Sequence, residues 1–204
     1  MVITAIETRA LHKKPLQRTL GAHRVQRMVY ILTDQLHAED EPTAAGAFAR
    51  YRAYLASVRG RMPPSALALA ESDWYFNARD HRAPHDAWLE TVTVVERGAG
   101  ERRQDRAVAL TIRLLGAYHD GYIELHYRDV TRYRIELAPS ETVGGGHRDW
   151  RYDELRLGPR GGVVHEIEWW GLEATGTWLI EAGDVEYRWL PVEGRTPVSS
   201  APDA

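Results

Sequence analysis

The stretch 118–137 reads YHDGYIELHYRDVTRYRIEL, and its pattern decides the fold. Between residues 123 and 128 apolar side chains alternate with polar ones, and this period of two is typical of a strand with one buried face. The alternation resumes from residue 132 to residue 137, after the interruption Asp129-Val130-Thr131. Two such strands so close together predict an antiparallel hairpin with a charged outer face.

More short strands are predicted on both sides of this stretch, with glycine-rich turns between several of them. They cover residues 88–95, 108–114, 152–157, 163–170, 177–181 and 185–190. Glycines stand at the breaks, as at residues 158–162, 171, 176 and 183. Many short strands with glycine turns predict a mainly antiparallel sheet, arranged as a meander, a sandwich or a half-barrel.

The N-terminal part combines two predicted strands, residues 2–9 and 28–32, with a helix that begins at Thr43 and ends before Gly60. The helix is indicated by apolar residues that recur at steps of three and four: Ala44, Ala47, Phe48, Tyr51, Leu55 and Val58. A shorter helix is predicted from Ser65 to Ala70, and residues 73–87 then form a linker. The prediction is therefore an α+β protein in which the N-terminal helical segment packs on the sheet.

The domain organisation follows from these elements. Residues 1–84 hold the N-terminal strands and helix, residues 85–191 form the antiparallel β-domain, and residues 1–191 together make one compact domain. The segment 192–204 is small, polar and rich in proline, which is typical of a disordered tail.

Composition restricts the classes of function. The chain has 204 residues, a formal net charge of −3 and no cysteine. An acidic balance argues against a nucleic-acid partner, and the lack of cysteine excludes disulfides and thiolate sites. The first residues do not form a signal peptide, and no apolar run is long enough to cross a membrane. We therefore expect a cytoplasmic protein without a membrane partner.

The segment HEIEWW, residues 165–170, is the main candidate for a binding surface. Glu166 and Glu168 share one strand face about 7 Å apart, which suits either the acid and base of a glycosidase or a solvated outer face. Trp169 and Trp170 point to opposite faces, so at least one of them is exposed or covered by the helix. Tryptophans at this density serve as a sugar platform, a protein interface or a core. The hypothetical binding residues are Trp169, Trp170, His165, Glu166 and Glu168.

Two His-Asp doublets, His85-Asp86 and His119-Asp120, invite comparison with metal-dependent phosphohydrolases. That chemistry needs further ligands that converge from helices, whereas both doublets lie at junctions between a loop and a predicted strand. The sequence therefore predicts no metal and no cofactor, with the doublets as the weak candidates. Additional ligands would come from His126, His147, His165, Asp129 and Glu166. No catalytic residue is predicted, because no phosphate loop or nucleophile elbow is present.

The segments HDAWLETVTV and YIELHYRDVTRY, together with the helical lead-in, resemble small uncharacterised bacterial β-rich proteins. Some of these are similar to the immunity proteins of polymorphic toxin systems. The shared pattern is a His-Asp-Ala start of the β-domain and a later turn, here Tyr127-Arg128-Asp129-Val130. The resemblance covers roughly residues 85–135 and implies a protein partner but no catalytic residues.

The sequence thus favours a protein-binding module that uses exposed tryptophans and charged strand faces. The alternative is a small-molecule-binding or hydrolytic β-barrel, with a pocket lined by Trp, His and the Glu166/Glu168 pair. Self-association of the chain through a sheet edge is compatible with either function.

Overall fold

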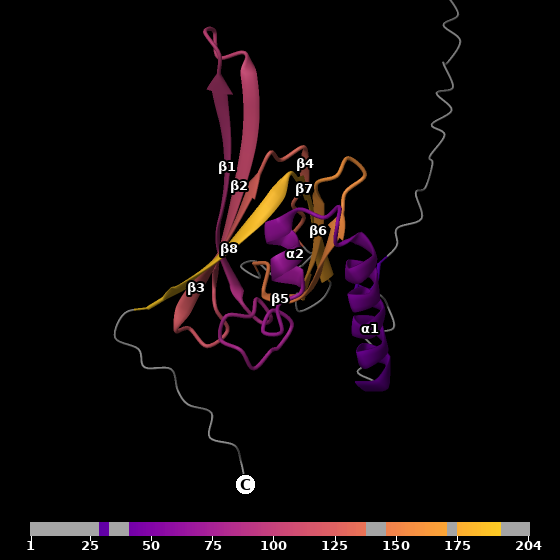
Figure 1. The fold of residues 1–204 in the computed structure, drawn as a ribbon. Coiled ribbons are helices and arrows are strands. Elements are labelled where there is room, and N and C mark those ends of the chain that lie inside the picture. Colours follow the sequence, from indigo (N-terminus) through magenta and orange to yellow (C-terminus); the bar gives the residue numbers. More distant parts are fainter. Residues whose placement is uncertain (1–28, 33–40, 138–145, 171–174, 193–204) are drawn as a thin grey trace, which may run out of the picture.

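The computed structural model describes residues 29–32, 41–137, 146–170 and 175–192 (Figure 1). Within these ranges the fold is α+β and mainly antiparallel, as predicted. The predicted strand at residues 2–9 and the tail beyond residue 192 lie outside the described residues. The elements are α1 (Glu41–Val58), α2 (Pro64–Ala70), β1 (Trp88–Ala99), β2 (Asp105–Leu115), β3 (Gly121–Arg128), β4 (Arg132–Arg134), β5 (Asp149–Leu157), β6 (Val163–Trp170), β7 (Thr175–Ala182) and β8 (Asp184–Pro191).

The eight strands form one open antiparallel sheet in the order β4-β7-β6-β5-β1-β2-β3-β8. The sheet has two halves, because β5 and β1 pair at a single position, Trp88 opposite Asp149. On the far side β7 runs almost directly into β8, with only Gly183 between them. β7 pairs in one half and β8 in the other, so a strand that bends at a glycine joins the halves, as in orthogonal sheet packing.

The predicted hairpin of residues 123–137 is wrong, because β4 pairs with β7 and not with β3. Residues 129–131 do not reverse the chain. Instead Val130 N–H donates to the Val108 carbonyl at 2.9 Å, and Thr131 N–H donates to the Glu181 carbonyl at 2.8 Å. Asp129 has a positive φ of 52°, and Gly183 N–H donates to its carbonyl and to that of Arg128. The segment between β3 and β4 therefore bends beside Gly183, where the chain bends between β7 and β8.

The predicted strand at residues 28–32 is also wrong for its described part, residues 29–32, which make no strand. Their backbone is held by a carboxylate. The N–H groups of Tyr30 and Ile31 each donate to Glu154 Oε2 at 2.8 Å, and that of Leu32 lies 3.4 Å from the same atom. Ile31 is fully buried. The apolar run that predicted a buried strand is instead a short segment whose backbone is anchored by Glu154.

Helix α1 has the predicted apolar face, and it packs along the edge of β5. Ala47, Tyr51, Leu55 and Val58 are buried. The Tyr51 hydroxyl donates to the Leu155 carbonyl at 2.8 Å and accepts from Leu155 N–H at 2.9 Å. The Tyr54 hydroxyl accepts from Leu157 N–H at 2.8 Å. These two hydroxyls satisfy the edge of β5 where β1 has diverged from it, as buried backbone groups require.

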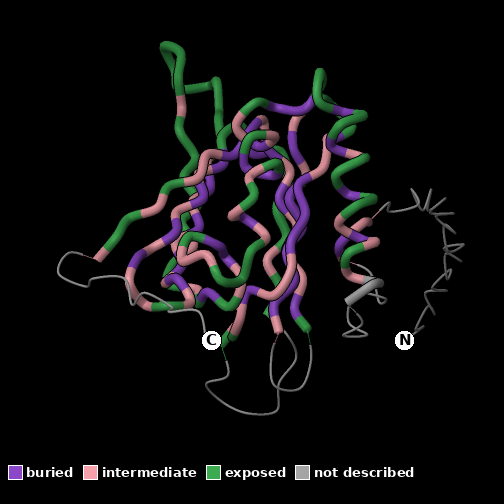
Figure 2. The backbone as a smooth tube through the Cα atoms, turned by 60° about the horizontal axis from the view of Figure 1, so that its bottom comes forward, coloured by how far each residue is buried: buried purple, intermediate pink, exposed green. Residues whose placement is uncertain are grey.

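Helix α2 packs between β8 and β5. Its first residues donate N–H groups to Asp184, with Ala66 N 2.9 Å from Oδ1. A carboxylate at this end of a helix is favourable. One hydrophobic core contains residues of both helices and of both sheet halves, and Figure 2 shows its buried residues at the centre of the molecule.

Candidate functional site

The structure places His165 and Trp169 on the inner face of the sheet, both with no exposed surface. The Trp169 ring packs 5.3 Å from Trp150 and 4.9 Å from Trp178 between ring centroids. Trp169 is therefore a core residue and cannot form the exposed platform that the sequence predicted.

Trp170 is the partly exposed member of the pair. The guanidinium carbon of Arg151 lies 4.2 Å from its ring centroid. Its indole N–H donates to Glu168 Oε1 at 3.1 Å, and Glu168 itself is buried. This outer face of β6 is thus already occupied by contacts within the chain.

Glu166 does not stand free beside Glu168 as a catalytic pair requires. It is buried, and Arg156 Nη2 lies 2.5 Å from its Oε2. Arg156 also pairs with Glu154, which holds the backbone of residues 30–32. A largely buried arginine shared by two buried carboxylates is a structural arrangement. The hypothesis that this strand face is solvated is therefore wrong.

A buried hydrogen-bond chain crosses the interior and joins three strands to the 71–87 segment. Asp153 lies at its centre, where Oδ2 accepts from the Tyr75 hydroxyl at 2.8 Å and Oδ1 accepts from Trp150 Nε1 at 2.9 Å. His165 Nε2 lies 2.9 Å from Asp153 Oδ2, and its Nδ1 lies 2.6 Å from the Tyr127 hydroxyl. All five side chains are at most 3% exposed.

The chemistry of the carboxylate sets the direction of the central hydrogen bond. A carboxylate only accepts hydrogen bonds, so His165 Nε2–H donates to Asp153, and the Tyr127 hydroxyl bonds to Nδ1 on the other side of the ring. Burial raises the pKa of Tyr75 and of Tyr127 well above the ordinary value of 10. The tyrosines stay protonated, and the chain acts as a satisfied polar core. The pairing of Asp153 with Tyr75 carried no signal in the sequence, since the two residues lie 78 positions apart along the chain.

Neither His-Asp doublet gathers the three ligands that a metal site needs among the described residues. Asp86 lies 3.1 Å from His85 Nδ1 and 3.3 Å from Arg151 Nη1, whereas Asp120 pairs with His81 at 2.5 Å. His119 packs against the ring of Trp88 at 4.8 Å. Among the described side chains, no group of three His, Asp or Glu residues could hold a metal ion.

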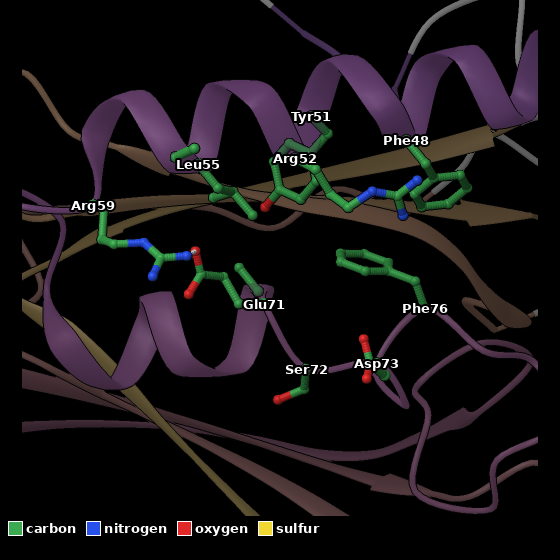
Figure 3. A pocket seen from close by; sticks show the side chains of 11 residues that line it. Phe48, Tyr51, Arg52, Leu55, Arg59, Glu71, Ser72, Asp73 and Phe76 are labelled. Carbon is green, nitrogen blue, oxygen red and sulfur yellow. Dashed lines mark hydrogen bonds and ion pairs between the residues drawn. The ribbon is translucent and has the colours of Figure 1, made fainter.

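A groove of about 380 Å³ lies between α1 and the segment that follows α2 (Figure 3). Phe48 and Phe76 face each other at one end, and the ion pair of Arg59 with Glu71, at 2.7 Å, closes the other. Arg52 and Asp73 also line the groove. A smaller cavity of about 130 Å³ shares Phe48 and Phe76 with the groove and reaches Trp150, Asp153 and His85.

The β1–β2 ribbon offers a different kind of surface. Figures 1 and 2 show that it projects from the rest of the sheet and is largely exposed toward its tip. Beyond Trp88, no strand among the described residues pairs with the outer edge of β1. Val94 and Val95 lie on opposite faces of this strand and are 42% and 37% exposed. Apolar side chains thus stand on both faces of an open edge.

Comparison of the chain with known protein families, with curated proteins and with solved structures gave no match. Within the described residues, neither helix has the length and apolar character that a membrane span needs. The fold and the surfaces above are therefore the basis for any statement about function.

Proposed function

We propose that this protein acts by binding another protein, and that the outer edge of β1 receives an extended segment of that partner. One observation carries the proposal: from Leu89 to Ala99 this edge has no partner strand in the described chain. An open edge presents backbone N–H and C=O groups in the arrangement that a further strand requires. Addition of a strand to such an edge is a recurring mode of peptide recognition.

The side chains of the edge support the same proposal. Natural edge strands are usually guarded by charges, prolines or bulges. Here the five residues 91–95, TVTVV, are uncharged and all β-branched, and charges begin only at Glu90 and Glu96. Glu96 is already paired with Arg106 at 2.8 Å. A partner strand therefore meets backbone and small apolar side chains, with charged residues at the rim, as in protein interfaces.

The class of partner follows from the resemblance to immunity proteins, since the resembling stretch 85–135 includes all of β1. We propose a toxin-like protein as the partner and the cytoplasm as the place of binding. The surface first predicted, Trp169 and its neighbours, is not part of this proposal because Trp169 is fully buried.

A photo-crosslinking amino acid at Thr93 tests the proposal in cells that produce the protein. The matched control carries the same amino acid at Ala45, which is exposed on α1. We expect one heterologous protein adduct at Thr93, identified by mass spectrometry, and no adduct of that protein at Ala45. An adduct with a second copy of this chain, an adduct only at Ala45, or no adduct at either position would overturn the proposal.

A further inference from the structure

The open edge of β1 has an apolar inner face. Val92 and Val94 lie opposite Ile112 and Leu110 of β2, which are fully buried. Opposite residues of an antiparallel pair share one face of the sheet, so both valines lie on the face that carries the core. Val92 packs against the core, whereas Val94 is 42% exposed at its margin. An apolar side chain placed beside these valines would extend the core and lose contact with water.

The outer face of the same edge is more polar. Thr91 and Thr93 are exposed on it, and Thr91 lies opposite Arg113, which pairs with Glu124 at 2.7 Å. Val95 is the one apolar residue that this stretch of β1 contributes to the outer face. Because successive residues of a strand point to opposite faces, a segment that pairs with this edge needs alternating side chains, with the apolar ones on the inner face.

Charged residues mark the two ends of the edge. Arg97 is exposed near the tip of the ribbon and lies opposite Ala107, and no described side chain pairs with it. Glu90 is exposed at the base of the ribbon and is likewise unpaired within the described residues. Glu96, by contrast, pairs with Arg106. Opposite charges on adjacent strands stabilise their pairing and like charges oppose it, so the edge favours an acid near its tip and a base near its foot.

The direction of an added strand follows from the rest of the sheet. β1 pairs with both of its neighbours in the antiparallel sense, and antiparallel pairing is slightly more stable per residue than parallel pairing. An antiparallel segment runs from the tip of the ribbon toward its base, so its acidic residue comes first. Residues 91–96 lie between Arg97 and Glu90, and about six residues of the segment therefore separate its acid from its base.

We propose that the segment received by β1 is an antiparallel amphipathic strand with a charge of opposite sign at each end. An acidic residue lies opposite Arg97, β-branched apolar residues lie opposite Val94 and Val92, polar residues alternate with them, and a basic residue lies near Glu90. This inference rests on the proposed function and names the chemistry of the partner at that site. Backbone pairing supplies the affinity, and the side-chain pattern supplies the specificity.

Three peptides of identical composition test this pattern. With its Asp opposite Arg97, DTTVTITK places Val and Ile on the inner face. DTVTITTK moves both apolar residues to the outer face, and KTTVTITD exchanges the end charges. Each peptide is titrated into the full-length protein while the backbone amide signals are followed by NMR.

We expect DTTVTITK to shift the amide signals of residues 91–97 saturably, with a dissociation constant on the order of 0.1 mM. DTVTITTK should bind about tenfold more weakly, because its apolar side chains stay in water. KTTVTITD should bind about threefold more weakly, because each end meets a like charge.

A change of charge in the protein locates the acidic end of the segment. Arg97→Glu should weaken DTTVTITK about fivefold, and the peptide KTTVTITK should bind this variant more tightly than it binds the unchanged protein. The matched control is Arg102→Glu, which reverses an exposed charge in the turn at the tip of the ribbon and should leave both affinities within about twofold. Dispersed spectra of both variants show that they fold.

Equal affinities of the three peptides, the absence of binding by all of them, or an equal loss in Arg102→Glu would overturn the inference. Crosslinking through Thr93 does not depend on this chemistry and separates the two proposals. A crosslinked protein partner together with equal or absent peptide binding would retain the proposed function and overturn the inference. The expected peptide preferences without a crosslinked partner would overturn the proposed function and support the chemistry of the edge.

Discussion

Strand β6 and the outer part of β1 are both apolar and β-branched in part, yet they end in opposite surroundings. β6 has a partner strand on each side, and six of its eight residues are buried, among them His165, Glu166 and Glu168. In β1 no residue is buried, and Val94 and Val95 face solvent. The difference arises from neighbours: β6 lies between two strands of the chain, whereas β1 parts from β5 after a single pairing and keeps only β2 as a neighbour.

Polar and apolar groups therefore face opposite requirements in the two regions. In the β5–β7 half, polar groups are enclosed, so each needs a partner within the chain, and Asp153, Arg156 and Glu154 supply those partners. In the ribbon, apolar side chains and backbone groups are open. The backbone groups can pair only with water or with another chain, and another chain would also cover the apolar side chains. The ribbon is therefore the candidate interface.

The neighbouring residues Trp169 and Trp170 give the largest expected contrast. Trp169→Ala should lower the free energy of unfolding by about 4 kcal/mol, because it opens a large cavity in the core. Trp170→Ala should lower it by about 1–2 kcal/mol, because that ring is partly exposed and loses its contact with Arg151 and its hydrogen bond to Glu168. Urea denaturation of both variants checks this. Equal losses would mean that the two faces of β6 are buried alike.

Asp153 and Asp149 sharpen the same contrast among polar groups. Asp153→Ala leaves Tyr75, Trp150 and His165 without their acceptor, and we expect a loss of about 3 kcal/mol. Asp149 accepts from Trp88 Nε1 at 2.8 Å near the surface, so Asp149→Ala should cost about 1 kcal/mol or less. A small loss for Asp153→Ala would show that the buried chain is not required for stability.

The pH dependence of stability tests the surroundings of His85. Because burial lowers its pKa in the folded protein, the unfolded chain takes up the proton first as the pH falls. The contribution of His85 to stability is therefore fully present above about pH 6.5. It is lost as the pH falls, by about 1.4 kcal/mol in total for each unit between the folded and unfolded pKa values. In His85→Gln the decline between pH 7 and pH 5 should be smaller. An identical slope in the variant would assign the decline to other groups.

The smallest effect on stability is expected in the ribbon. The double change Val94→Thr and Val95→Thr should alter the free energy of unfolding by less than about 0.5 kcal/mol, because both side chains are already exposed. Its effect should appear as reduced crosslinking of the partner through Thr93. As a control, Ile112 in the adjacent strand is fully buried. Ile112→Thr should therefore lower the free energy of unfolding by about 2 kcal/mol. A large loss of stability in the double variant would show that the valines pack within the chain.

Local patterns in the sequence predicted most elements correctly. The steps of three and four predicted α1, and alternation predicted β2 and β3, because a helix and a half-buried strand impose these periods on any sequence. The glycine breaks predicted β8. The errors lie where a distant residue decides. The residues near 28–32 do not predict the contact of this segment with Glu154. The segment HEIEWW likewise does not predict that Arg156 and Glu154 cover one face of β6 while the tryptophan cluster packs on the other.

The sequence alone thus determined the class of fold, the helical segment that packs on the sheet and the positions of most strands. It did not determine which strands pair, since β4 and β3 are adjacent in the chain but lie in different halves of the sheet. Pairing is settled by the bends at Asp129 and Gly183, and these depend on contacts between residues more than 50 positions apart. The same is true of the open edge of β1 and of the cavity at His85, because exposure and enclosure are properties of the assembled neighbours.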